Sequence, residues 1–179
     1  MLPPDIRILE GRAVPDGFHA RFLSCGTRYT YRMLNSRHAS AIRRLNFVHV
    51  PVPLDIGVMR EAAADLLGPH DFAAFQAAGG TARTTVRTIT EAALEQHGDE
   101  IIFTVYGNAF LYNMVRIITG TLIEIGHGKR DPDAFRRAYG SFDRLDLGVT
   151  APAHGLELTQ VDYPEAAFTD PDSIRWHKE

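Results

Sequence analysis

The stretch NAFLYNMVRIITG, residues 108–120, decides how the centre of this chain folds. It lies inside a run from Ile101 to Ile123 that contains a single charged residue, Arg116. Apolar side chains recur there at the three- and four-residue spacing of a helix, which predicts a long helix over residues 110–126. A guanidinium keeps its charge in such apolar surroundings. Burying it without an anion would cost several kcal/mol, so the position of Arg116 needs an explanation.

Arg116 lies about 140° around an ideal helix from the middle of the apolar stripe. It therefore leaves the main core and faces a second, partly apolar surface that Tyr112 and Ile123 flank. This position suits an arginine that lines a cleft. It equally suits an arginine that extends along its aliphatic stem to water. The helix pattern alone leaves both interpretations open.

Alternating residues predict strands on both sides of this helix. Residues 27–34, TRYTYRML, place two tyrosines and a methionine on one face and two arginines and a threonine on the other. Either face could be the buried one. Residues 86–96 and 100–106 flank a His-Gly-Asp turn and predict a hairpin. Weaker alternation predicts further strands over residues 5–13 and 156–161.

Helix signals complete the order of the elements. Helices are predicted over residues 54–67 and 132–139, the second with Asp131 as its cap and a proline at its first position. A short helical turn is predicted over residues 70–76. The sequence therefore predicts an α+β domain, in which helices pack on one face of a mainly antiparallel mixed sheet.

Length and composition are those of a globular domain. The chain has 179 residues, of which 45% are hydrophobic and 23% are charged, ordinary values for a soluble protein. No uninterrupted apolar run is long enough for a membrane span, and the N-terminus lacks the pattern of a secretory signal. The single Cys25 cannot form an internal disulfide, which favours a reducing, cytoplasmic setting.

The net charge of −3 hides an uneven distribution. Residues 18–54 contain no Asp or Glu but carry six arginines, with aromatic residues interleaved. Arginine binds phosphates in a fork and stacks on bases, so this stretch is typical of an RNA-binding surface. The alternative is that these arginines pair with acids elsewhere in the fold. The overall pI of 6.2 favours that alternative.

Five blocks in one order along the chain resemble the tRNA pseudouridine synthase A family, whose members isomerise uridines in the anticodon stem-loop of tRNA. The blocks are FHARF (18–22), RYTYR (28–32), HDFAAF (70–75), NAFLYNMVRIITGTLIEIG (108–126) and APAHGLELTQVDYP (151–164). The resemblance implies a cytoplasmic tRNA-binding isomerase that needs no cofactor. It also implies two α/β halves joined across a cleft, usually in a homodimer.

The family's catalytic aspartate belongs to an RTDAGVHA-like segment in the N-terminal half, and these residues contain no such segment. The chain therefore resembles the C-terminal domain, expected over residues 18–164. Residues 1–17 would be the end of the preceding half, and residues 165–179 a flexible tail. Such a chain is expected to be inactive without its aspartate-bearing half.

The resemblance implies roles for individual residues. Arg116 matches the arginine that pairs with the catalytic aspartate, which a buried guanidinium would keep ionised. Tyr29 matches the tyrosine that stacks on the flipped-out uracil. Leu156 and Leu158 match residues that line the base pocket, although apolar strand residues are more often plain core. The expected RNA contacts are His19, Arg21, Arg28 and Arg32.

Other chemistries have little support. The histidines show no HxxxH or HExxH spacing and the chain has one cysteine, so no metal site is expected. The glycine-rich GGTAR, residues 79–83, lacks the GK[ST] of a nucleotide-binding loop. Asp162 has no paired carboxylate. Two hypotheses remain: the cleft-forming domain of a pseudouridine synthase, and an RNA-binding or dimerisation module without chemistry.

Overall fold

The computed structural model describes residues 2–169, which form two compact units. One unit comprises residues 26–161, and the other comprises residues 2–25 together with residues 162–169. Both boundaries fall inside the domain expected over residues 18–164. Within the part of the chain that the structure describes, no helix is long and apolar enough to cross a membrane.

A six-stranded sheet forms one layer of the 26–161 unit, in the order β2-β1-β5-β4-β3 with β6 also paired to β1. The β1–β5, β4–β5 and β3–β4 pairs are antiparallel, whereas the short β1–β2 pair is parallel. The predicted mixed, mainly antiparallel sheet is thus confirmed. The strands are β1 Gly26–Leu34, β2 Val48–His49, β3 Gly68–Asp71, β4 Val86–His97, β5 Glu100–Gly107 and β6 Leu156–Asp162.

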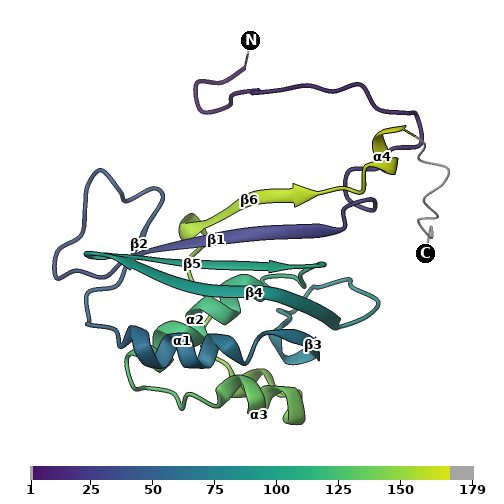
Figure 1. Ribbon diagram of the computed structural model, residues 1–179. Helices are drawn as coiled ribbons and strands as arrows, with labels where there is room; N and C mark the ends of the chain where they lie inside the picture. Colours follow the sequence, from purple (N-terminus) through teal and green to yellow (C-terminus); the bar gives the residue numbers. More distant parts are fainter. Residues whose placement is uncertain (1, 170–179) are drawn as a thin grey trace. The chain divides into compact units, whose positions relative to one another are not determined.

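Helices α1 (Ile56–Ala64), α2 (Met114–Gly126) and α3 (Ala134–Ser141) lie on one side of this sheet, as predicted (Figure 1). Tyr31 and Met33 of β1 are fully buried beneath them, so the tyrosine-bearing face of β1 is the covered one. Three short 3-10 turns, Ala73–Phe75, Arg144–Asp146 and Ala153–Gly155, link the elements, and α4 (Ala166–Thr169) belongs to the other unit.

Helix α2 is enclosed on nearly every side, which explains its almost wholly apolar sequence. Its buried residues include Met114, Ile118 and Leu122. Two glycines admit close neighbours: a Cβ on Gly126 would lie 2.6 Å from the Met59 sulfur of α1, and one on Gly120 would lie 1.7 Å from the Val149 carbonyl oxygen. Close packing of this kind leaves α2 little freedom to shift.

Two predicted helix starts are wrong. Helix α2 begins at Met114 and not at residue 110, because Asn113 has a φ of 58° and the helix cannot extend through a left-handed residue. Helix α3 begins at Ala134, with Asp133 at its N-cap. Asp131 instead forms a turn, in which the Ala134 N–H donates to its carbonyl oxygen at 3.2 Å.

The strand predicted over residues 5–13 is also wrong, because that stretch is irregular. Ile8 and Leu9 are 72% and 97% exposed, so its alternation buries no face. The helix predicted over residues 54–67 is shorter than expected, with the Asp55 side chain accepting from the Val58 N–H as its cap. Strand β3 was not predicted, and it occupies the first part of the expected turn at 70–76. Of the expected tail, residues 170–179 lie outside the described residues.

Candidate functional site

Arg116 lies in the first turn of α2 and is anchored to the segment at Ala151. Its Nε donates to the Ala151 carbonyl oxygen at 2.7 Å, and its Nη1 donates to Asn113 Oδ1 at 3.1 Å. In return, the Ala151 N–H donates to the Arg116 carbonyl oxygen at 3.0 Å. The side chain is partly buried. Its position is therefore fixed by bonds from two separate parts of the chain.

Both partners of the Arg116 guanidinium are neutral. Among residues 2–169, no carboxylate oxygen lies within the 4.0 Å of an ion pair with Arg116. The positive charge of Arg116 acts on the neighbouring Tyr31. Burial raises the pKa of Tyr31, and the Arg116 guanidinium partly opposes that rise. A partly buried guanidinium with only neutral partners favours the binding of an anion next to it.

The segment that holds Arg116 is itself held by the core. The Tyr31 hydroxyl donates to the Pro152 carbonyl oxygen at 2.6 Å. On the other side, the Val149 carbonyl oxygen occupies the space that a side chain at Gly120 would need. Residues 149–152 are therefore clamped between β1 and α2, and the acceptor for Arg116 is fixed before any ligand arrives.

Several residues of the loop before α2, residues 108–113, have a structural role. The Asn108 side-chain oxygen accepts from the Thr88 N–H at 2.9 Å and so prolongs the β4–β5 pairing. Leu111 is buried in the core, whereas Phe110 is half-buried at its edge. Asn113 adopts the left-handed conformation that asparagine tolerates, and its side-chain oxygen accepts from Arg116 Nη1. The motif therefore ends the sheet, starts the helix and orients the arginine.

Tyr29 lies on the helix-covered face of β1, two residues before the buried Tyr31. Its ring meets Phe110 edge to face, with centroids 5.2 Å apart and an interplanar angle of 89°. The ring is half-buried, and burial raises the pKa of its hydroxyl, so the phenol is neutral near pH 7. No hydrogen bond of that hydroxyl joins it to the residues described. A perpendicular ring contact of this kind fixes the orientation of the Tyr29 ring.

Arg28 and Arg32 lie on the opposite face of β1 from Tyr29, since alternate residues of a strand point to opposite faces. Arg28 Nη1 pairs with Glu91 at 2.6 Å, and Arg32 Nη2 pairs with Glu157 at 3.1 Å. The structure therefore does not bring these two arginines together with Tyr29 and Arg116. Their RNA-binding role stays a prediction, and each carries its charge in an ion pair.

His19 and Arg21 belong to the other unit. His19 Nδ1 accepts from the N–H groups of Arg21 and Phe22 at 3.2 and 3.3 Å, which forms a tight turn. Arg21 is exposed, and its guanidinium carbon lies 5.9 Å from the centroid of the Phe22 ring, which is itself 54% exposed. An exposed arginine beside an exposed ring is a surface on which a base can stack.

The two predicted pocket leucines have different surroundings. Leu156 packs against the core, whereas Leu158 is 52% exposed on the same face of β6. Leu156 also lines a hollow of about 300 Å³ together with Arg32, Asn46 and His154. The hollow thus joins two predicted site residues, but Tyr29 is not among its lining residues.

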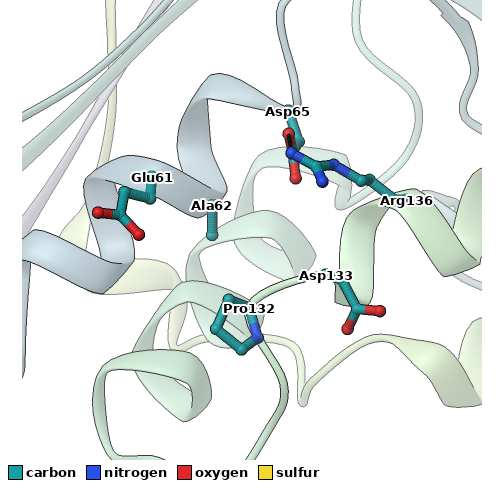
Figure 2. A pocket seen from close by; sticks show the side chains of 6 residues that line it. All are labelled: Glu61, Ala62, Asp65, Pro132, Asp133 and Arg136. Carbon is teal, nitrogen blue, oxygen red and sulfur yellow. Dashed lines mark hydrogen bonds and ion pairs between the residues drawn. The ribbon is translucent and has the colours of Figure 1, made fainter.

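A second hollow, of about 200 Å³, lies between α1 and α3 (Figure 2). Its charged lining residues are Glu61, Asp65, Asp133 and Arg136, and Arg136 Nη2 pairs with Asp65 Oδ1 at 2.6 Å. Three carboxylates and one paired guanidinium give this hollow a negative character. It contains none of the predicted site residues.

Sequence reasoning assigned no role to Phe110, Asn113 or Ala151, which support Tyr29 and Arg116. Asn113 carried a usable signal, because an asparagine just before an apolar run is typical of a left-handed residue or a cap. Phe110 gave no such signal, since its contact with Tyr29 depends on the β1–β5 pairing. Ala151 acts through its backbone, which no sequence pattern reveals.

A mainly antiparallel sheet covered by helices on one face defines the class of the 26–161 unit as an α+β domain, in which Arg116 is held by neutral partners and Tyr29 packs against Phe110. Residues 62–164 match the model of a family described as tRNA pseudouridine synthase. Three proteins named tRNA pseudouridine synthase A are similar to this chain. The protein from Halalkalibacterium halodurans is 49% identical to it, the one from Ligilactobacillus salivarius 44% and the one from Acetivibrio thermocellus 47%. The chain belongs to the tRNA pseudouridine synthase family.

The alignments cover more of this chain than of its relatives. They include 87%, 92% and 91% of the chain, but 59%, 65% and 67% of the three relatives in the same order. The chain therefore spans about three-fifths to two-thirds of the length of the curated relatives it matches.

Proposed function

We propose that this chain supplies the uridine-binding side of the active site of a tRNA pseudouridine synthase, which isomerises uridine to pseudouridine in the anticodon stem-loop. The observation that carries the proposal is Arg116: a fixed guanidinium with two neutral partners, and no carboxylate partner among residues 2–169. In a family whose chemistry needs an ionised carboxylate, that guanidinium is its natural counter-ion.

The isomerisation breaks the bond between C1′ of the ribose and N1 of the uracil, and it forms a bond between C1′ and C5. The proton on C5 leaves and N1 becomes protonated, so uridine and pseudouridine have the same composition. The carboxylate that acts as nucleophile or base must stay ionised in a largely dry site. In this proposal it belongs to an RTDAGVHA-like segment outside the present residues, and Arg116 holds it ionised and in place.

Tyr29 receives the uracil ring in this proposal, because a perpendicular contact with Phe110 fixes the orientation of its own ring. Leu158 offers an exposed apolar surface on the same sheet face, as the wall of a base pocket requires. Arg21 and His19 remain the candidates for RNA contacts in the other unit. A contact by Arg28 or Arg32 would require exchange of Glu91 or Glu157 for a phosphate.

The partners in the proposal are tRNA, an aspartate-bearing half and a second copy in a homodimer. The compartment would be the cytoplasm, and no cofactor takes part. The alternative hypothesis, a module that binds RNA or dimerises without chemistry, differs in one respect: it needs no carboxylate opposite Arg116.

The test is tritium release from tRNA labelled at C5 of uridine. We expect no turnover by the 179-residue chain. We expect turnover by a chimera that adds, from the Halalkalibacterium halodurans relative, the part of that protein outside the aligned region. Turnover by the chain alone would show that another acid, such as Asp162, can act. RNA binding by the chimera without turnover would favour the non-catalytic module.

Substitution of Tyr29 separates stacking from proton transfer. The chimera with Tyr29→Phe should bind tRNA nearly as well as the unsubstituted chimera, because the ring and its contact with Phe110 remain. Tyr29→Leu should lose roughly 1–3 kcal/mol of binding free energy, the value of one base stacked on an aromatic ring. Filter binding and turnover are measured on both. Equal activity of all three proteins would remove Tyr29 from the site, and a Phe variant as inactive as Leu would assign a proton-transfer role to the hydroxyl.

A further inference from the structure

Two stretches without acidic residues meet at one end of the sheet. Residues 72–90 and residues 101–123 contain no Asp or Glu, and their cations are Arg83, Arg87 and Arg116. The end of β5 pairs with the start of β4, and the Asn108 N–H donates to the Thr88 carbonyl oxygen at 3.1 Å. The Ala77 N–H reaches across to the Tyr112 carbonyl oxygen, also at 3.1 Å. The fold thus gathers positive charge at this end and excludes negative charge from both stretches.

Arg87, near the start of β4, is a partly buried arginine without an acid. Its Nη1 donates to the Val86 carbonyl oxygen at 2.6 Å and to Thr84 Oγ1 at 3.3 Å. Its Nε is buried and has no hydrogen-bond partner, and burial lowers the pKa of the guanidinium. No carboxylate within residues 2–169 forms an ion pair with it. The charge of Arg87 is therefore offset by no anion within the described residues, so the accessible part of its guanidinium can bind one.

The partly buried arginines Arg28, Arg32 and Arg130 differ from Arg87 in this respect. Each pairs with a glutamate, at 2.6, 3.1 and 2.8 Å respectively. The chain therefore provides acids for these three arginines, whereas Arg144, also partly buried, bonds within the described residues to the Leu147 carbonyl oxygen and Thr150 Oγ1. An acid next to this end of the sheet, Asp71 of β3, lies opposite Val86 and accepts from the Ala73 N–H at 3.0 Å, and it forms no ion pair with Arg87.

The register places Arg87 on the same sheet face as Tyr29. Tyr29 pairs with Val105, and Gly107, two residues further along β5, pairs with Ile89. Arg87 precedes Ile89 by two residues, so it points to the same face. Phe110 contacts the Tyr29 ring, and its ring would lie 3.4 Å from a Cβ at Gly107, the residue opposite Ile89.

We propose that Arg87 binds a phosphodiester of the RNA strand next to the nucleotide that stacks on Tyr29. This inference rests on the proposed function and adds to it a residue that positions the RNA backbone. A guanidinium presents parallel N–H donors that match the two non-bridging oxygens of a phosphate. Nη2 of Arg87 forms no hydrogen bond within residues 2–169 and is not fully buried, so a phosphodiester oxygen can reach it, and the phosphodiester meets no acid on the two stretches.

The experiment measures binding of the 179-residue chain to an anticodon stem-loop RNA hairpin at several salt concentrations. We expect Arg87→Gln to weaken binding about tenfold, the value of one charge-assisted contact. The slope of log K against log salt should fall by about 0.7 to 0.9, the share of one phosphate. Arg60→Gln is the matched control, because Arg60 of α1 donates from Nε to the Leu94 carbonyl oxygen at 2.9 Å and has no carboxylate in ion-pair range in the described chain. It should leave the slope unchanged.

A second variant keeps the guanidinium and supplies the missing anion. Thr84 is exposed and already accepts from Arg87, so Thr84→Glu places a carboxylate within reach of it. It should lower the salt slope as Arg87→Gln does, and by more than Thr81→Glu, which adds the same charge to the same exposed loop. This variant serves if Arg87→Gln does not fold.

An unchanged slope in both the Arg87 and the Thr84 variants, with RNA still bound, would overturn the phosphodiester proposal alone. If those variants instead impair only the turnover of the chimera, the ligand of Arg87 is a carboxylate of the aspartate-bearing half. If the original chain binds no RNA at any salt concentration, both this inference and the RNA-binding part of the proposed function fail.

Discussion

Arg116→Met in the chimera should lower turnover by at least about a hundredfold, the scale expected when one electrostatic partner of the reacting group is removed. Without the guanidinium, the carboxylate opposite it would lose its counter-ion in a largely dry site. Its pKa would rise, and the ionised fraction at neutral pH would fall. Because the group would then ionise only at higher pH, the remaining activity of the variant should increase as the pH is raised. The measurement is tritium release against pH.

Arg116→Met should also destabilise the chain, by about 1–3 kcal/mol, because the buried carbonyl oxygen of Ala151 loses its donor. Urea unfolding of the 179-residue chain measures this part separately. Arg60→Met is the control, since it also removes a guanidinium bonded to a backbone carbonyl, and its activity in the chimera should stay near the original. Arg116→Lys should keep part of the activity, because it keeps the charge but loses the fork. Full activity of Arg116→Met would exclude Arg116 from the chemistry.

Gly120→Ala should destabilise the chain by about 1–3 kcal/mol, the usual cost of overpacking a closed core. The added Cβ would lie 1.7 Å from the Val149 carbonyl oxygen, and both positions are backbone, so one of them must move. The movement that relieves the clash takes residues 149–151 away from α2. Arg116 then loses its acceptor at Ala151, and turnover of the chimera should fall together with stability.

Gly140→Ala is the matched control for this change, because Gly140 lies in α3 and a Cβ there meets nothing within 4 Å. It should be neutral or stabilise the chain by up to about 1 kcal/mol, through the higher helix propensity of alanine. Urea unfolding of the two variants side by side separates the packing effect from the propensity effect. If Gly120→Ala is as stable as Gly140→Ala, the segment at 149–151 is not clamped to α2.

The sequence by itself determined the elements whose residues carry a local period. The apolar stripe predicted α2, alternation predicted β1, and the alternating runs around Gly98 predicted β4 and β5. Local periods succeed because a buried face must repeat with the geometry of its own element. They failed over residues 5–13, where Ile6 and Ile8 alternate but lie exposed. Alternation indicates that a strand would have one apolar face, but a strand forms only where another part of the fold buries that face.

The sequence also singled out Arg116 as the charge in an apolar helix, and the resemblance of the blocks gave it a role. Only the tertiary structure decided what holds it. The backbone at Ala151 and the side chain of Asn113 serve as acceptors, because Gly120 and Tyr31 fix the intervening segment. Tertiary pairing likewise neutralised arginines that composition had grouped, because Arg28 and Arg32 met Glu91 and Glu157. Arg87, outside that group, met no acid within residues 2–169. A sequence records how many charges a chain carries, but which of them are neutralised depends on strand register, and register brings together residues that are far apart in the chain.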